Sequence, residues 1–550
     1  MKYLLEKINN TRGYLILANI LLVFFLILLS NLKVLPMGNI GDFLFLSFLF
    51  LALALYRPGW AFLFFIGTIA LENINLAPVS LGIAVRPYQF FAAITIFAVL
   101  VRFAAKRLNF KLPKFLFIDG AMIFFALAGF LSALFSANRG MSLKQSVVAF
   151  SFVAIYFLVR IFIHNMEDLK KITPFFLSSS VIIALYGIWQ NVRFLHNLSS
   201  FEAMPGRPNG TFSEADWLGI FVIFLIAILY SIIYYLSKRA TSSNDAQIFN
   251  FQFSIFNQFS ISKFTILKVF LYILLTTSYI LLILTVSRSA WLGALIVTVS
   301  YLLIIFTNLK LSPREWQWKN TLQIKLGILS CLVISVAIVY FFNLTSFQLF
   351  NRAESTGTGL QKITISCRLE PSSKNFQELG SRIDSIDELN QFGCRHINLE
   401  DIDAEKARGN FVTEVYRTDP NVSIRSGIYQ KSWQQIKAHP ILGIGWGGIG
   451  EVLGRDGRGN TLNSSNIFLE IWLGAGILGL ASFVLAWSYI IVMSFWAFSK
   501  KQEKIATYSL FMILAWFALF IPNLFNAGIF LGLLWIFGGI AVSLLNYQEE

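Results

Sequence analysis

The sequence predicts an all-α polytopic membrane protein with about 12–14 transmembrane helices and a large extracytoplasmic loop that carries a small α+β subdomain. Three observations lead to this fold class. Hydrophobic residues make up 56% of the 550 residues and charged residues only 13%, whereas a soluble domain carries about 25% charged residues. Uncharged runs recur along most of the chain, and Lys and Arg are divided unequally among the connecting segments. A large globular protein with many buried helices does not produce this pattern.

Each apolar run is assigned to one or two helices, because about 20 helical residues cross the hydrocarbon core. The long runs cover residues 14–30, 116–136, 172–192, 216–236, 266–306, 324–342 and 467–498. Shorter candidates cover residues 43–56, 60–77, 88–104, 145–163, 506–522 and 526–545. With 266–306 divided in two, the sequence predicts 14 helices, with 12 or 13 as alternatives. The first run starts like a signal peptide, but no small-residue cleavage site follows Ser30, so it is predicted to stay as a helix.

The placement of Lys and Arg predicts the orientation of the chain, because these residues are retained on the cytoplasmic side. With both termini in the cytoplasm, the inner connections collect 23 positive charges. The short outer connections hold seven, which are Lys33, Arg86, Arg139, Lys144, Arg193, Arg207 and Arg288. The sequence therefore predicts a multi-pass protein of the cytoplasmic (inner) membrane.

One connection, residues 343–466, is too long for an ordinary loop and is predicted to form an extracytoplasmic domain between helices 1–11 (residues 1–342) and the C-terminal helices (467–550). It contains 14 Lys and Arg and 14 Asp and Glu, so the net charge of +15 belongs entirely to the membrane part. The basic balance reflects orientation in the membrane, and nucleic acid is not an expected partner. The cytoplasmic segment 241–265 is a low-complexity insertion to which we assign no chemistry.

Residues 361–418 of the loop are predicted to form the α+β subdomain. Ile363, Ile365, Cys367 and Leu369 alternate as in a half-buried strand, and residues 376–389 have helical spacing. Two further strands are expected near 394–400 and 410–417. Cys367 and Cys394 lie on predicted strands outside the cytoplasm and form a candidate disulfide if the compartment is oxidising.

A helix and a glycine-rich turn are predicted at 423–450, where "AHPILGIGWGGIG" has the spacing G-x-G-x-x-G through Gly443, Gly445 and Gly448. A dinucleotide-binding turn needs a preceding strand, a following helix and an acidic residue about 20 positions later. This segment has none of the three. We interpret it as a flexible or close-packed external turn, with a nest of N–H groups for phosphate as the alternative.

The sequence resembles the O-antigen ligase and O-antigen polymerase superfamily in four motifs that occur in the same order. "RPNGTFSEADWLGIF" and "TVSRSAWLGALI" are similar to an Arg/Gly-Thr-Phe loop and a Ser-Arg motif. "RSGIYQKSWQQIKAHPILGIGWGGIG" and "NSSNIFLEIWLGAGILGLASFVLAW" are similar to its C-terminal signature. The resemblance implies a GT-C-type glycosyltransferase that moves glycan from undecaprenyl pyrophosphate to an acceptor hydroxyl, without metal, nucleotide or other cofactor. It also implies glycan or lipid acceptors, membrane lipids and polysaccharide-assembly proteins as partners.

The same resemblance nominates the site residues. Such a transfer expels a lipid pyrophosphate, whose developing charge arginine is suited to hold. Arg288 and Arg425 match the two functional arginines of the family, and Arg207 and Arg86 are candidates for a pyrophosphate clamp. Ligases of this family carry a His as the proposed general base at the position where this sequence has Ser465, followed by Asn466. Carboxylates that could replace this base are Glu214, Asp216, Glu470, Glu451 and Asp456.

The sequence does not separate polymerase from ligase, although the missing His favours a polymerase or a divergent transferase. Two other classes stay open. The first is a membrane transporter of small anions, although the inverted repeats common in transporters are not evident. The second is a family member that binds lipid-linked glycan without transferring it.

Overall fold

A computed structural model describes residues 11–107, 112–204, 206–239, 263–311, 318–345, 360–368, 382–384, 386–397, 402–455, 461–499 and 503–546. Asp456 and all of the low-complexity insertion except residues 263–265 lie outside these ranges. The chain divides into two compact units, of which the first comprises Met1–Val339 with Gln435–Glu550 and the second Tyr340–Gln434.

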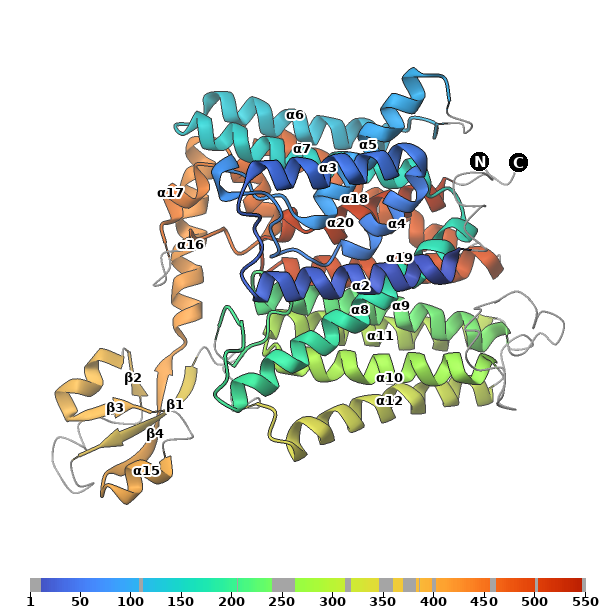
Figure 1. The fold of residues 1–550 in the computed structure, drawn as a ribbon. Coiled ribbons are helices and arrows are strands. Elements are labelled where there is room, and N and C mark those ends of the chain that lie inside the picture. The colour runs from blue at the N-terminus through green and yellow to red at the C-terminus, as the bar shows by residue number, and fades with distance from the viewer. Residues whose placement is uncertain are drawn as a thin grey trace. The chain divides into compact units, whose positions relative to one another are not determined.

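The first unit is a bundle of helices that run side by side (Figure 1). The helices before the second unit are α2 (Arg12–Asn31), α3 (Ile40–Tyr56), α4 (Pro58–Thr68), α5 (Pro87–Ala104), α6 (Phe117–Phe135), α7 (Arg139–Phe162), α8 (Met166–Leu195), α9 (Ala215–Arg239), α10 (Lys263–Leu284), α11 (Arg288–Leu311) and α12 (Trp318–Phe341). After it come α17 (Ile449–Leu453), α18 (Ile467–Ser499), α19 (Glu503–Asn523) and α20 (Gly532–Leu545), with 3-10 turns η1 (Val79–Leu81) and η5 (Gly528–Phe530).

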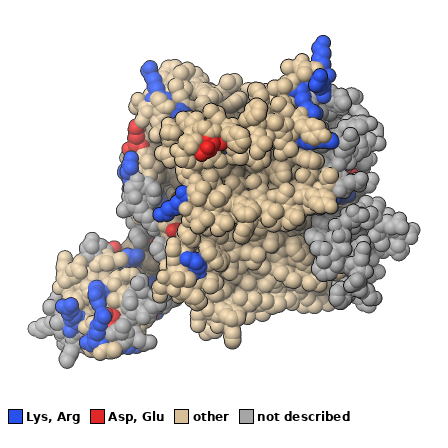
Figure 2. Space-filling model, viewed as in Figure 1, with Lys and Arg blue, Asp and Glu red and all other residues tan. Residues whose placement is uncertain are grey.

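Ten of the described helices are long and apolar enough to cross a membrane, and four shorter apolar helices accompany them. The all-α polytopic prediction is therefore correct, and these helices fall where the sequence predicted its 14 segments. Figure 2 shows a broad uncharged surface over the bundle, with most Lys and Arg near its two margins. The protein is a multi-pass membrane protein.

Two of the predicted spans are short interior helices. The 11 residues of α4 and the 14 residues of α20 extend about 17 and 21 Å at 1.5 Å per residue, less than the roughly 30 Å of a hydrocarbon core. Nearly every residue of α4 is buried. These helices therefore pack inside the bundle and end before their neighbours do.

The predicted run 60–77 stops being helical at Thr68 and continues as a buried loop. Asn75 stabilises this loop, because its Oδ1 accepts hydrogen bonds from Val85 N (2.8 Å) and Ala77 N (3.1 Å). Asparagine often replaces backbone partners in this way in turns. Apolar periodicity did not reveal the break, since the loop is nearly as apolar as the helix before it.

The second unit contains a four-stranded sheet in the order β2-β4-β1-β3. The central strand β1 (Leu360–Cys367) pairs antiparallel with β4 (Phe411–Thr418) and β3 (Cys394–His396), and β2 (Arg382–Ile383) pairs parallel with β4. Ile363, Ile365, Val415 and Leu389 form its core, to which the disulfide Cys367–Cys394 contributes. Helices α15 (Ile402–Ala407) and α16 (Pro420–Ala438) complete an α+β arrangement.

The helix expected at 376–389 differs from the structure in its described part, where β2 and a 3-10 helix η3 (Ile386–Phe392) occur instead. Residues 369–381 lie outside the described residues. Helix α16 begins at Pro420, three residues before the expected start. Proline is favourable at the first helical position, because its fixed φ is already helical and the N–H that it lacks would have no partner there.

Glu405 on α15 connects this helix to the sheet. Its Oε2 accepts hydrogen bonds from Ser366 Oγ (2.7 Å) and Asn410 Nδ2 (2.8 Å). Its Oε1 accepts from Arg395 Nη2 (2.8 Å) and Arg408 Nη1 (2.7 Å). The hydrogen bonds from Ser366, Arg395 and Asn410 lower the pKa of Glu405 from 4.5 to about 2.

Replacing Glu405 with Gln should destabilise the second unit at neutral pH. Because the folded-state pKa is depressed to about 2, ionised Glu405 stabilises the fold above the unfolded-state pKa of about 4.3, and this contribution disappears as the pH falls towards 2. Hydrogen-exchange protection of β1 and β4, measured in the full-length protein, should therefore differ between wild type and Glu405→Gln most strongly at pH 7 and about half as much at pH 3, where the folded-state carboxylate is still mostly ionised. Glu414→Gln, which removes an exposed ion pair with Lys362, is the control. An equal difference at both pH values would contradict the assignment.

Candidate functional site

The turn between α10 and α11 carries Arg288 at the first position of α11. Val286 in this turn has a φ of 50°, a left-handed conformation that is costly for a β-branched residue. Trp291 Nε1 donates to Leu282 O (3.1 Å) across the turn. The turn is therefore a tight and strained hairpin that fixes where α11 begins.

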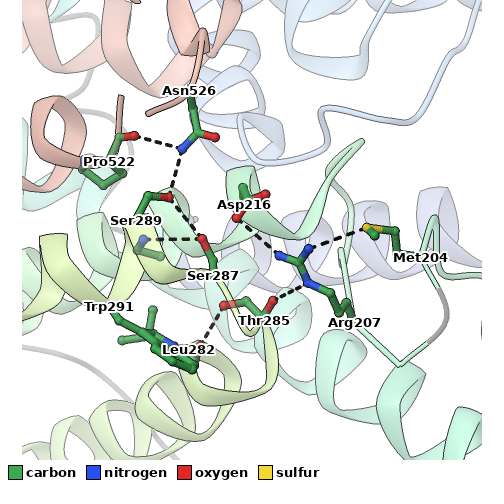
Figure 3. Close-up of polar contacts among 11 residues, drawn as sticks. Met204, Arg207, Asp216, Leu282, Thr285, Ser287, Ser289, Trp291, Pro522 and Asn526 are labelled. Carbon is green, nitrogen blue, oxygen red and sulfur yellow. Dashed lines mark hydrogen bonds and ion pairs between the residues drawn. The ribbon is translucent and has the colours of Figure 1, made fainter. Parts of the chain in front are cut away.

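Two serines beside Arg288 bind this turn to the connection between α19 and α20 (Figure 3). Asn526 Nδ2 donates to Ser289 Oγ (3.1 Å) and to Pro522 O (2.9 Å), and the hydroxyls of Ser287 and Ser289 are 3.2 Å apart. All three side chains are buried. Arg288 lies between these two serines in the sequence, and its side chain is half-buried. The hydrogen bond from Asn526 to Ser289 therefore holds the backbone next to Arg288 against the α19–α20 connection.

Arg207 fixes the same turn from the other side, and each nitrogen of its guanidinium is used by the protein (Figure 3). Nε donates to Thr285 O (2.9 Å), Nη2 to Asp216 Oδ1 (3.3 Å) and Nη1 to Met204 Sδ (3.6 Å). The residue is only 7% exposed. Arg207 therefore joins the 203–216 segment to the α10–α11 turn.

The 203–216 segment also reaches the loop that follows α4. Asn73 N donates to Thr211 O (2.8 Å), and the Thr211 hydroxyl donates to Ala70 O. Gly210, whose φ is 55°, donates its N–H to Gln190 Oε1 (2.8 Å). Connections from four different parts of the chain thus meet at one end of the bundle, where α12 ends and α18 begins; we call it the loop end.

Arg86 lies at the loop end in a network with Glu72 and Tyr88. Arg86 Nη1 is 3.1 Å from Glu72 Oε2 and donates to Tyr88 Oη (3.0 Å) and Phe530 O (3.4 Å). Tyr88 Oη donates to Glu72 Oε2 (2.9 Å), and Gly532 N donates to Glu72 Oε1 (2.9 Å). Glu72 was not among the sequence candidates, although it is the one acidic residue between Asp42 and Asp119, a pattern that suggests function in a membrane protein.

The predicted polar pair lies directly before α18. Ser465 has a φ of 52°, and its N–H donates to Asn463 Oδ1 (2.9 Å). Asn466 caps the helix, because its Oδ1 accepts from Phe468 N (2.9 Å) and Leu469 N (3.1 Å). Its Nδ2 donates to Leu524 O (2.9 Å), just beyond α19. The Asn466 side chain is thus used in holding α18 against the end of α19.

The carboxylate candidates fall into different surroundings. Glu470 is buried, and its Oε2 accepts from Ser464 N (2.8 Å), so it closes the turn before α18. Glu451 accepts from Asn138 Nδ2 (2.6 Å), and Glu214 is exposed before α9. Asp216 lies beside the α10–α11 turn, where its Oδ1 accepts from Arg207 Nη2. Arg425 is half-buried on α16 in the second unit.

The glycine-rich turn is packed into a kink in α18. Gly476, with a φ of 65°, interrupts that helix, and Ile444 N donates to Leu473 O (2.7 Å) while Ile477 N donates to Pro440 O (3.2 Å). A Cβ on Gly443 would lie 2.6 Å from Trp472 O, and one on Gly474 would overlap the Trp446 ring. These contacts agree with the close-packed alternative.

The phosphate-nest alternative is not favoured, because four N–H groups of the turn already have protein acceptors. Gly443 N donates to His439 O (2.9 Å), Ile444 N to Leu473 O, Gly447 N to Ser142 Oγ (3.1 Å) and Gly448 N to Gly445 O (3.0 Å). The backbone carbonyl of His439 thus contributes to the turn by accepting the hydrogen bond from Gly443 N. No cluster of three or more metal-ligating side chains occurs among the residues that the structure describes.

Comparison with known proteins finds a family whose model matches part of the chain. Residues 270–484 match a family model described as O-antigen ligase. The matched segment contains Arg288, Arg425, Ser465, Asn466 and Glu470, whereas Arg86, Arg207 and Asp216 precede it. No curated protein and no solved structure matches the chain.

Replacing Gly443 with Ala should destabilise the bundle by about 2 kcal/mol or more, because the added Cβ combines a left-handed backbone with a backbone collision. Gly140→Ala is the matched control, since Gly140 lies in the first turn of α7 and a Cβ added there would meet no atom within 4 Å. Thermal unfolding in detergent, followed by tryptophan fluorescence, should show a lower midpoint for Gly443→Ala and an unchanged or higher one for Gly140→Ala. Equal midpoints would show that the turn is not close-packed.

Proposed function

Because residues 270–484 match the O-antigen ligase family, we propose that this membrane protein transfers glycan from an undecaprenyl-pyrophosphate-linked donor to an acceptor hydroxyl. The reaction takes place on the extracytoplasmic face, with both termini in the cytoplasm. The family match supports glycan transfer of the ligase or polymerase type. The observation that carries the proposal is the position of Arg288, which begins α11 within the matched segment on a turn fixed by Arg207 and Asn526.

The proposed reaction is a displacement at the anomeric carbon of the donor sugar. The acceptor oxygen forms a bond to this carbon, the bond to the pyrophosphate oxygen breaks, and its electron pair leaves with the lipid pyrophosphate. Negative charge then develops on phosphate oxygens, where positioned cationic donors stabilise the transition state. We assign this role to Arg288 and Arg86, which both belong to the first unit. Arg207 has its donors occupied and serves to position the turn.

The proton of the acceptor hydroxyl needs an acceptor, and Ser465 is unsuited because a hydroxyl is a poor base at neutral pH. We assign this role to Asp216. Its Oδ1 accepts from Arg207, while no hydrogen bond of its Oδ2 is found within the described residues. Its side chain is 30% exposed, so a substrate can reach it. Asn466 and Glu470 maintain the start of α18 and act as positioning residues.

The function is tested by incubating purified protein in liposomes with a labelled undecaprenyl-pyrophosphate glycan from its host. A ladder of lengthened lipid-linked products identifies a polymerase, and a single new conjugate identifies a ligase. Donor binding without transfer would leave a non-catalytic glycan-binding protein. Uptake of small anions by the same liposomes, without transfer, would identify a transporter.

Arg288→Ala should lower kcat/KM by about 100-fold to 1,000-fold, as expected when one charge-stabilising group is removed. The rates of product formation are compared with those of Arg193→Ala, which removes another arginine near the loop end that stacks on Trp189. The control should stay within about twofold of wild type. Equal losses in both variants would contradict a specific role for Arg288.

Asp216→Asn should lower kcat by about 100-fold, while donor binding changes little because the amide oxygen still accepts from Arg207. The loss should appear in single-turnover transfer from bound donor, whereas the donor Kd should stay within about twofold of wild type. Asp42→Asn, at an exposed acidic residue in the first turn of α3, provides the control. A single-turnover rate in Asp216→Asn equal to that of Asp42→Asn would remove Asp216 from the mechanism.

A further inference from the structure

Glu72 is a buried carboxylate whose contacts all converge on the groups around Arg86. Its side chain is 1% exposed, against 24% for that of Arg86. A buried carboxylate costs free energy unless it is paired and hydrogen-bonded. Here Arg86, Tyr88 and Gly532 N supply the partners. The arrangement therefore joins the start of α5 to the start of α20 through one carboxylate.

The distribution of acceptors around Arg86 is one-sided. Glu72 Oε2, Tyr88 Oη and Phe530 O all lie at Nη1. No hydrogen bond from Nε or from Nη2 is found within the part of the chain that the structure describes. A guanidinium presents its Nε and Nη2 hydrogens along one planar edge, which matches two oxygens of a phosphate. This edge is the part of Arg86 that stays available to a ligand.

Arg207 shows the contrasting case. Its three nitrogens donate to a carbonyl, a carboxylate and a thioether, and the residue is almost completely buried. Of the two sequence candidates for the clamp outside the matched segment, Arg86 keeps an edge that no described residue occupies, whereas every nitrogen of Arg207 has a partner. The difference arises from Glu72 and its neighbours, which gather at a single nitrogen of Arg86.

We propose that Glu72 is a positioning residue that orients Arg86 so that its Nε–Nη2 edge binds the pyrophosphate of the lipid-linked donor. This inference rests on the proposed function and extends it to a residue that contacts no substrate. Tyr88 assists, because its hydroxyl donates to Glu72 and accepts from Arg86. Gly532 N connects the same carboxylate to α20, so the position of α20 and that of Arg86 are set together.

A chemically matched cluster elsewhere in the bundle provides a control. Asp119 on α6 pairs with Arg160 and accepts from Tyr156 Oη (2.7 Å), and its side chain is also 1% exposed. Phe152 packs against Tyr88, and Arg160 lies eight residues further along α7, which is about 12 Å by helical rise. Asp119→Asn therefore removes a comparable ion pair away from the loop end.

The decisive experiment compares Glu72→Gln with Asp119→Asn in the full-length protein in liposomes. Glu72→Gln should raise the donor KM, and the Kd for undecaprenyl pyrophosphate, by about tenfold, with kcat reduced less than about threefold. Asp119→Asn should leave both constants within about twofold of wild type. Arg86→Ala should raise KM similarly, and adding Glu72→Gln to it should have no further effect, since Glu72 acts through Arg86.

When the wild-type protein transfers glycan, several results would overturn the role of Glu72 and leave the proposed function standing. These are an unchanged or lowered KM in Glu72→Gln, an increase equal to that of Asp119→Asn, or additive effects in the double variant. A lowered KM would mean that net positive charge, and not orientation, governs binding. If Glu72→Gln does not fold, Tyr88→Phe replaces it with an expected KM increase of about threefold, and no increase would overturn the inference. Wild-type protein that neither transfers glycan nor binds undecaprenyl pyrophosphate would overturn the proposed function as well.

Discussion

The loop end depends on one constraint, which is that a polar group inside an apolar bundle must find its partner within the protein. Helix α4 ends at Thr68 inside the bundle, so the backbone that follows cannot rely on water. Asn75 supplies the acceptors for part of this loop, and Thr211 connects it to the 203–216 segment. Arg207 in this segment donates to Thr285 O and so joins the segment to the α10–α11 turn. Each connection is ordered because it completes the hydrogen bonds of another.

This dependence explains why arginines at the loop end serve different purposes. A guanidinium has five donors, and the protein can engage all three of its nitrogens, as at Arg207, or gather its acceptors at one nitrogen, as at Arg86. The first arrangement makes a rigid connection and the second leaves a surface for an anion. Positive charge alone therefore does not identify a binding residue. The number of donors left over after folding is the better criterion.

The pattern of apolar residues along the chain predicted the fold well, whereas it named candidate site residues without their contacts. Apolar runs predicted the helices, because the thickness of the bilayer sets the length of such runs. The alternation of apolar and polar residues predicted the paired strands β1 and β4. The early end of α4 was missed because an apolar loop has the same composition as a buried helix. Arg207 was identified as a candidate, but its role depends on Thr285, which is distant in sequence. Glu72 could have been found from its isolation among apolar residues, yet its partner Gly532 could not.

The glycine-rich turn has a consequence for how activity is inferred across homologous proteins. Gly443 and Gly474 are required by the backbone of α18 and by the Trp446 ring, both of which are matters of architecture. Selection for a stable bundle would preserve these glycines in a homologue that had lost its chemistry. In this protein the glycine-rich motif therefore reports packing around α18 and not chemistry. Whether a given homologue still acts on sugars must be judged from other positions, whose substitution leaves the bundle intact.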